Sequence, residues 1–155
     1  MNVESSAHSD VINVIFRENK SQRGGSLVLG NSELSISGCK FSRSVSLYGG
    51  CIYAEDFSRV NVQDSEFMHS TSLLGGVMYL IMGEANFTST LFESNSGLDS
   101  AKLSNFNSQY ASFTGEASTG GVFTTTLGHL TLHNCVAMHN GAQYGKYLSF
   151  MMMMM

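Results

Sequence analysis

A repeat of about 25 residues constrains the fold of this chain more than any other feature of its sequence. Residues 41–53 read FSRSVSLYGGCIY and residues 67–79 read FMHSTSLLGGVMY, so that a Phe, a Gly pair and a Tyr recur at matching places. A period of this length is typical of solenoids, in which each repeat stacks on its neighbours. The anchor positions lie 21–26 residues apart, at Phe16, Phe41, Phe67, Phe92, Phe113 and, with a smaller side chain, Ala137.

Glycine pairs and alternating apolar residues recur in register with these anchors. Before each anchor, apolar residues alternate with polar ones, as in Leu34-Ser35-Ile36, which is the periodicity of a β-strand. The glycines suit a corner that needs a positive φ or a close approach between backbones. The pairs are Gly24-Gly25, Gly49-Gly50 and Gly75-Gly76, with weaker matches at Ser100-Ala101, Gly120-Gly121 and Gly145-Lys146.

These positions predict an all-β fold, a single-stranded parallel β-helix of about six coils of 21–26 residues that spans residues 11–150. One coil cannot bury its apolar face alone, so successive coils stack about 4.8 Å apart and the anchor residues form an inward ladder. We expect the right-handed form that most such folds adopt. Residues 1–10 are expected to form a polar N-terminal lead-in, and no cap is evident at either end. Bare ends favour a segment of a longer solenoid over a complete small domain.

The same motifs carry a resemblance to a known family. F-x-x-N occurs at Phe16/Asn19 and Phe92/Asn95, with Ala137/Asn140 as a variant, and G-G-x-[ILM] occurs at residues 24–27, 49–52 and 75–78. In register, these motifs resemble the repeats of the chlamydial polymorphic outer membrane proteins and of related β-helix surface proteins of bacteria and protists. The resemblance spans roughly residues 11–150, although Ser44, Ser70 and Glu116 replace the Asn. It implies an extracellular or cell-surface location and an adhesin-like role.

Composition and charge exclude some classes of function. Charged residues make up 13% of the chain and its net charge is −4, with no basic patch, so no nucleic-acid partner is expected. Residues 1–10 lack the basic start and apolar core of a secretory signal. The apolar end, residues 148–155, is far shorter than the ~20 residues that cross a bilayer. We favour an unstructured or artefactual poly-Met tail at residues 151–155 over the start of a membrane segment.

Three cysteines, Cys39, Cys51 and Cys135, show no metal-binding C-x-x-C spacing. Cys39 and Cys135 occupy the same inward position four coils apart, which is about 19 Å at this stacking distance and too far for a disulfide. A bridge from Cys39 to Cys51 requires the corner to fold back. We therefore expect buried free thiols.

Outward positions on the first strand of each coil predict a binding surface made of amides and hydroxyls. Such a face could hydrogen-bond a polysaccharide or a partner strand, and the alternative is a solvated face whose like residues bond along the ladder. Asn86-Phe87-Thr88 is also a possible glycosylation acceptor. One row holds Ser35, Asn61, Asn86, Asn107 and Thr131, the second holds Ser37, Gln63, Thr88, Gln109 and His133, and Glu33, Arg59 and Glu84 alternate in sign beside them.

The connections at residues 29–32, 54–58 and 80–83 are a second candidate surface. Leu80, Ile81 and Met82 are unusually apolar for an exposed connection, and exposed apolar patches mark protein interfaces. Folding back of these residues onto the corner is an equal alternative.

No catalytic, cofactor or metal site is predicted. A carbohydrate-active enzyme of this fold needs clustered carboxylates, but Glu55/Asp56, Asp64/Glu66 and Asp99 do not converge on one face. Four of the histidines, His69, His129, His133 and His139, occupy outward or bend positions. The sequence therefore favours a non-enzymatic structural or adhesive module that binds a protein or a glycan. A non-catalytic fragment of a polysaccharide-active enzyme and a subunit that self-associates end to end are the alternatives.

Overall fold

The computed structural model describes residues 1–4, 7–99, 106–115 and 122–144. Several sequence-based expectations lie outside these residues. They are the corner residues Ser100-Ala101, Gly120-Gly121 and Gly145-Lys146, the polar position Glu116 and the poly-Met tail.

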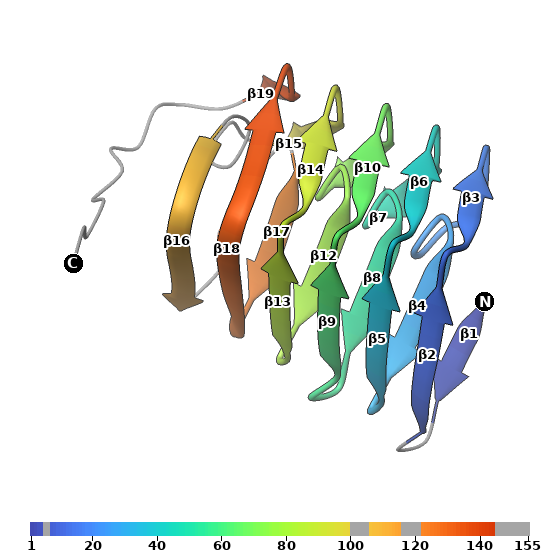
Figure 1. The fold of residues 1–155 in the computed structure, drawn as a ribbon. Helices are drawn as coiled ribbons and strands as arrows, with labels where there is room; N and C mark the ends of the chain where they lie inside the picture. The colour runs from blue at the N-terminus through green and yellow to red at the C-terminus, as the bar shows by residue number, and fades with distance from the viewer. Residues whose placement is uncertain (5–6, 100–105, 116–121, 145–155) are drawn as a thin grey trace.

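The described residues form a β-solenoid of about four turns, with strands stacked in parallel and no helix (Figure 1). Each regular coil contributes one strand to sheet A, two consecutive strands to sheet B and one strand to sheet C. Sheet A contains β1 (Asn2–Glu4), β4 (Leu27–Gly30), β8 (Ile52–Glu55), β12 (Met78–Ile81) and β17 (Phe123–Thr126). Sheet C contains β7 (Val45–Tyr48), β11 (Thr71–Leu74), β15 (Ser96–Asp99) and β19 (Gly141–Tyr144).

Sheet B bends between its two halves, and both halves share one long strand, β18 (Gly128–Met138). The first half contains β2 (His8–Ile12), β5 (Glu33–Ser37), β9 (Arg59–Gln63) and β13 (Glu84–Thr88). The second half contains β3 (Ile15–Arg17), β6 (Lys40–Ser42), β10 (Glu66–Met68) and β14 (Leu91–Glu93). β1 and β2 begin inside residues 1–10 and pair with β4 and β5, so strands of the first coil occupy the expected lead-in.

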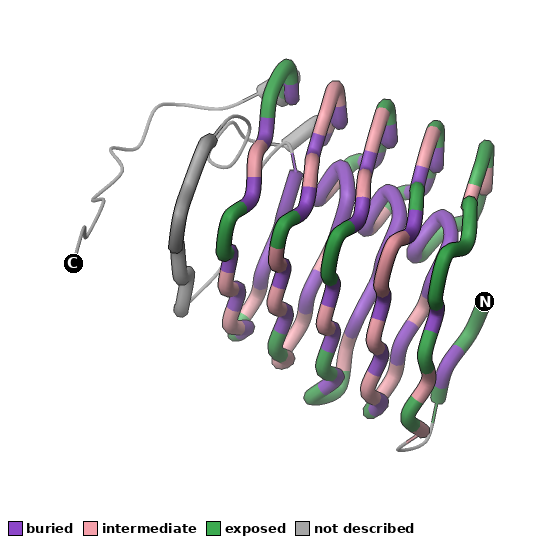
Figure 2. The backbone as a smooth tube through the Cα atoms, in the orientation of Figure 1, coloured by how far each residue is buried: buried purple, intermediate pink, exposed green. Residues whose placement is uncertain are grey.

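The core is a set of ladders that run along the solenoid axis (Figure 2). The predicted Phe stack is confirmed at its first four positions. Ring centroids lie 4.6 Å apart for Phe16 and Phe41, 4.5 Å for Phe41 and Phe67, and 5.5 Å for Phe67 and Phe92. Aliphatic rows from sheets A and B fill the rest of the interior, and parallel pairing holds each residue over its equivalent in the next coil.

The prediction of a stacked coil at residues 106–113 is wrong. β18 pairs directly with β13 and β14, and this register places Ala137, not Phe113, beside Phe92. β16 (Phe106–Gly115) instead runs antiparallel to β18, with Phe113 opposite Leu130. Alternating polarity is common to parallel and antiparallel strands, so the sequence pattern predicted a strand here without specifying its direction or its partner. Among the described residues, the solenoid has about four turns, with five stacked strands in sheet A, instead of about six coils.

The Gly-pair corner behaves as predicted. Gly49 has φ +63°, and a Cβ there would lie 1.9 Å from the carbonyl oxygen of Ile52. Gly50 serves the close approach between coils, because a Cβ there would lie 2.0 Å from the carbonyl oxygen of Gly76. Gly75, at φ +65°, repeats the first role in the next coil.

The other corners also use left-handed residues, but mostly not glycine. At the bend inside sheet B, the left-handed residues of the first four coils donate their backbone N–H groups to the next coil, as from Asn13 to Ser37 and from Asp64 to Thr88. Hydrogen bonds between coils therefore hold these residues at a positive φ, which is unfavourable for a residue with a Cβ. The rows are Asn13, Gly38, Asp64, Ser89 and Asn134 at this bend, and Glu18, Arg43, His69, Ser94 and His139 between sheets B and C.

Candidate functional site

The outward residues of β5, β9, β13 and the first half of β18 form a surface that we name the polar face. Strand pairing places the members of each row directly beside one another in adjacent coils, and all eight side chains are exposed or half-buried. The rows are Ser35, Asn61, Asn86 and Thr131, and Ser37, Gln63, Thr88 and His133. The predicted rows are thus confirmed over four coils.

Asn107 and Gln109 do not extend the polar face as predicted. Both lie on β16, which is antiparallel, and the backbone of Asn107 is opposite Val136 instead of following Asn86 in the row. The correction has the same cause as the missing coil: the strand that carries these residues pairs in the opposite direction.

Amides within the polar face bond along the solenoid axis. Asn86 donates from Nδ2 to Oδ1 of Asn61 over 3.1 Å, and both side chains are half-buried. This is the ladder bonding that the sequence offered as an alternative to a binding role. The same hydrogen bond holds the side chain of Asn86, the possible glycosylation acceptor, against the neighbouring strand β9. Gln63, by contrast, is exposed and donates to the carboxylate of the adjacent Asp64 over 2.9 Å.

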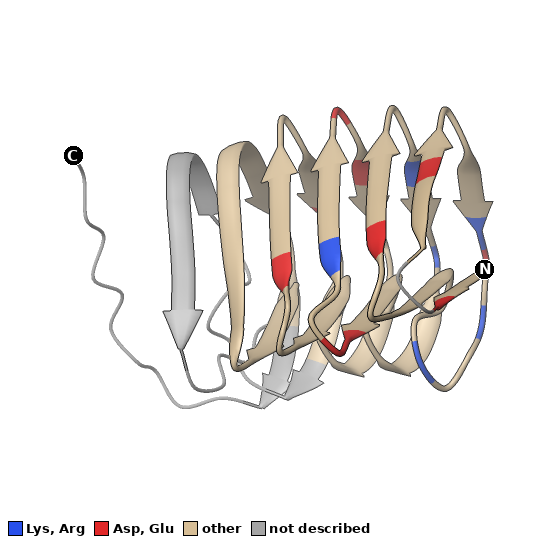
Figure 3. Ribbon diagram, turned by 90° about the horizontal axis from the view of Figure 1, so that it is seen from below, with Lys and Arg blue, Asp and Glu red and all other residues tan. Residues whose placement is uncertain are grey.

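A charged row borders the polar face along the starts of the same strands (Figure 3). Glu33, Arg59 and Glu84 are neighbours in consecutive coils, as predicted. Arg59 Nε lies 3.3 Å from Glu84 Oε2, and His8 Nδ1 lies 3.6 Å from Glu33 Oε2 at the first coil. These exposed pairs contribute about 0–1 kcal/mol each to stability. Their alternating signs favour this stacking register over others.

The apolar connection at residues 80–83 is only partly a surface. Leu80 belongs to β12 and is 1% exposed in the core, so it is not available to a partner. Ile81 and Met82 are half-buried, and Met82 is left-handed with φ +48°. Leu80 therefore folds back into the core, which was the alternative expectation. For Ile81 and Met82, a contact with a partner stays a prediction. The apolar residues exposed at this corner are Phe57 at 76% and Leu127 at 61%.

A tyrosine cluster on the outer side of sheet A was not predicted. Tyr79 lies between Tyr53 and Tyr48, with ring centroids 5.8 Å and 5.7 Å away. The guanidinium of Arg23 lies 5.2 Å from the centroid of the Tyr53 ring, and Arg23 Nη1 lies 3.5 Å from Glu55 Oε1. The signal in the sequence was the Tyr that follows the second and third Gly-Gly-x-aliphatic motifs, Tyr53 and Tyr79.

The hydroxyl of Tyr53 is fixed by its neighbours. It donates to Glu55 Oε2 over 2.6 Å. Burial of the ring, followed by the hydrogen bond and negative charge of Glu55, raises the pKa of Tyr53 above its usual range. The hydroxyl therefore stays protonated and acts as a donor. Tyr48 and Tyr79 are half-buried, so the cluster presents aromatic surface beside a cation and a carboxylate.

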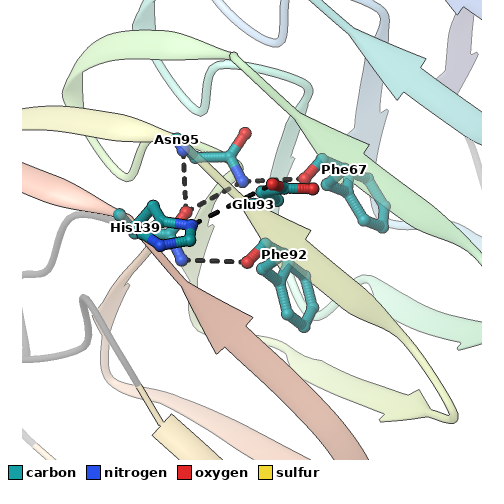
Figure 4. Close-up of polar contacts among 6 residues, drawn as sticks. Phe67, Phe92, Glu93, Asn95 and His139 are labelled. Atoms are coloured by element: carbon teal, nitrogen blue, oxygen red, sulfur yellow. Dashed lines mark hydrogen bonds and ion pairs between the residues drawn. The ribbon is translucent and has the colours of Figure 1, made fainter.

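Buried asparagines at the corner between sheets B and C have a structural role (Figure 4). Asn95 donates from Nδ2 to the carbonyl of Phe67 over 2.8 Å and accepts from the N–H of Ser70 over 3.0 Å. Asn140 repeats the arrangement one coil later, accepting from the N–H of Asn95 over 2.7 Å and donating to the carbonyl of Phe92 over 3.0 Å. At Phe92/Asn95 and Ala137/Asn140, the asparagine of the motif is thus an inward amide that bonds the corner backbone. Asn19, in the first F-x-x-N motif, donates from Nδ2 to the hydroxyl of Ser26 over 3.2 Å.

The cysteines are buried free thiols, as predicted. Burial raises the pKa of Cys51 from 9.0 to about 12 and also raises the pKa of Cys135. A thiol held protonated is a poor nucleophile, so the environment of Cys51 and Cys135 disfavours thiol chemistry. Cys39 donates to the carbonyls of Val11 and Ser37, each over 3.3 Å.

Within the part of the chain that the structure describes, no group of three or more His, Cys, Asp or Glu side chains could hold a metal ion. Nor do residues 1–4, 7–99, 106–115 and 122–144 include a helix with the length and apolarity required to span a membrane. Comparison of the chain with known protein families, with curated proteins and with solved structures gives no match.

Proposed function

We propose that this chain is a non-enzymatic structural or adhesive module of a larger cell-surface or extracellular protein, and that it presents the polar face to a protein or glycan partner. The observation that carries the proposal is the register of the two polar rows over four coils. A repeated set of amides and hydroxyls at about 4.8 Å matches an extended partner that itself offers repeated hydrogen-bonding groups. The surface location rests on the resemblance of the F-x-x-N and G-G-x-[ILM] motifs.

The stacked core supports this role because it holds the surface rigid. Outward side chains project from strands whose inward residues are almost fully buried, such as Val62 at 2% and Phe87 at 1%. Preorganised side chains lose little conformational entropy when a partner binds. A rigid surface of mainly uncharged polar side chains is therefore suited to making many weak hydrogen bonds along an extended ligand.

Between the two partner classes, the tyrosine cluster favours a glycan. Tyr48 and Tyr79 offer half-buried rings beside Arg23 and Glu55. Aromatic rings pack on the apolar faces of sugars, while neighbouring charged groups can bond their hydroxyls. A protein partner would use the polar face by hydrogen bonding and the exposed Phe57 by apolar contact.

The test is binding of the labelled full-length chain to intact cells, before and after enzymatic removal of either surface glycans or surface proteins. We expect binding that one treatment abolishes, and the treatment that succeeds identifies the partner class. A polar-face variant, Gln63→Ala with Thr88→Ala and His133→Ala, should weaken binding about tenfold or more, because three outward side chains are truncated.

The matched control alters three exposed residues of sheet C, Val45→Ser, Thr71→Ala and Leu73→Ser. It should bind like the unaltered chain. Absence of binding to any cell type by a correctly folded chain, or a control that loses binding while the polar-face variant retains it, would refute the proposal.

A further inference from the structure

The two ends of sheet B differ in a way that limits how this protein can associate. At one end, β16 pairs antiparallel with β18 along both halves of the sheet, from Phe106 opposite Ala137 to Gly115 opposite Gly128 (Figure 1). At the other end, β2 and β3 are the last strands of the sheet order, and among the described residues each pairs on one side only. Unpaired strand edges are templates for further pairing.

The backbone hydrogen bonds between the first two coils identify which groups face outward at this edge. Ala7 accepts from the N–H of Glu33, and Asn13 donates to Ser37, so the odd-numbered residues of β2 face the second coil. After the bend, Val14 accepts from Lys40 and Glu18 donates to Ser42. Successive residues of a strand direct their backbone groups to opposite edges. The groups left facing outward are those of His8, Asp10, Ile12, Ile15 and Arg17.

The side chains at this edge are unusually apolar for their rows. Ile12 is 62% exposed, although its equivalents in later coils are polar, beginning with Ser37 and Gln63. Ile15 is 70% exposed, and the equivalent residue of the next coil is Lys40. Exposed isoleucines confined to an edge strand indicate that a partner covers them.

We propose that β2 and β3 form a two-fold interface with a second copy of this chain, with the axis passing through the bend between Asn13 and Val14. In this antiparallel register the bends of the two copies coincide. Ile12 lies opposite Ile15 of the second copy, and Asp10 lies opposite Arg17 of the second copy. Both pairs join residues whose backbone groups face the free edge, so each pair can exchange two hydrogen bonds.

Charge and core packing agree with this register. The side chains of Asp10 and Arg17 are 57% and 65% exposed, and among the described residues their ion pairs are local, with His8 and Glu18 respectively. Symmetry would create two Asp–Arg pairs and a cluster of four isoleucines. The inward Val11 would lie opposite Phe16, whose ring stacks on Phe41 within its own chain. Pairing of β16 with β18 shows that sheet B accepts an antiparallel strand across its bend.

The occupied end of the sheet decides between two ways of associating. Head-to-tail stacking that continues the parallel coils would require a free edge on β18, but the antiparallel strand β16 covers that edge. Head-to-head pairing uses only the edge of β2 and β3, and a two-fold contact closes after two copies. The proposal therefore specifies a dimer instead of a filament, and it does not depend on the proposed partner of the polar face.

The test is sedimentation equilibrium of the full chain over a wide concentration range. We expect a reversible monomer–dimer equilibrium with nothing larger. Asp10→Arg and Arg17→Asp should each raise the dimer dissociation constant about tenfold or more, since each places like charges opposite one another. The double variant should restore the original value. Ile12→Ser should also weaken the dimer, whereas Val45→Ser, an exposed aliphatic residue on sheet C, should not.

Circular dichroism confirms that each variant keeps the unaltered chain's fold before its mass is measured. A monomer at every concentration would overturn the proposal, as would growth beyond the dimer. A dimer that neither single charge reversal weakens would place the interface elsewhere and would equally overturn it.

Discussion

Replacing Phe67 with Ala tests the central ladder. Phe67 is fully buried and contacts three rings, stacking on Phe41 and Phe92 and meeting Phe87 edge-on with centroids 6.0 Å apart. Removing a buried Phe side chain costs about 3–5 kcal/mol through lost transfer energy and the cavity left behind. Aromatic pairs are worth ~0.5–1.5 kcal/mol each beyond the area they bury, so for a ring with three aromatic partners we expect a loss at the upper end of that range, about 4–5 kcal/mol.

Two variants show whether the loss comes from the central position in the stack. Phe16→Ala removes a half-buried ring with one partner, Phe41, and should cost about 1–2 kcal/mol. Phe67→Leu keeps most of the volume but loses the three ring contacts, so it should cost less than Phe67→Ala, about 1.5–3 kcal/mol. Urea unfolding, followed by far-ultraviolet circular dichroism, measures all three, with equal m-values as the check that the comparison is valid. A loss below about 1 kcal/mol for Phe67→Ala, or equal losses for both Ala variants, would refute the ladder.

Three further predictions concern the corners and the buried thiols. Gly49→Ala should cost at least about 2 kcal/mol, because φ +63° and the Ile52 carbonyl both oppose a Cβ, whereas Gly141→Ala, which meets nothing within 4 Å, should change unfolding free energy by less than about 0.5 kcal/mol. Asn95→Ala should cost about 2–3 kcal/mol in the same assay, because it leaves buried backbone groups without partners. Burial raises the pKa of Cys51 from 9.0 to about 12. The protonated thiol therefore makes its full contribution to the free energy of unfolding below pH 9. Between pH 9 and about pH 12 that contribution falls by up to about 1.4 kcal/mol per pH unit. Stability of the chain should therefore fall more steeply with rising pH than that of Cys51→Ala, and parallel pH profiles would contradict the assigned burial.

The repeat predicted the fold where it had several independent signals. Phe41 and Phe67 are each followed by a small residue and a Gly pair, and the structure stacks them 4.5 Å apart. The prediction of a glycine corner was also correct at Gly49. Only a residue without a Cβ tolerates both the positive φ at this position and the nearby carbonyl oxygen of Ile52.

The failures arose where the pattern does not specify a partner. Phe113 follows Phe92 at nearly the right interval, yet the chain places Ala137 beside Phe92. An antiparallel strand keeps the same alternation of polar and apolar residues, so direction could not be inferred. The left-handed corners at Arg43 and His69 were also missed, because backbone bonds to the next coil, not side-chain propensity, impose them.

The candidate site was predictable to the extent that it follows the repeat. Asn61 and Asn86 lie in adjacent coils as expected, because their strands repeat without insertion. Tyr48 and Tyr79 come from different sheets, and their proximity depends on the corner geometry between them. Sequence alone does not supply that geometry.

The most direct test of the solenoid is the order of contacts along its Phe ladder. Nuclear Overhauser spectra of chain labelled at Phe rings and Ala methyls would measure it in solution. The structure predicts cross-peaks that connect Phe41 to Phe67, Phe67 to Phe92, and Phe92 to the methyl of Ala137. Cross-peaks from Phe92 to Phe113, with none to Ala137, would instead mean an unbroken six-coil stack and would contradict the account.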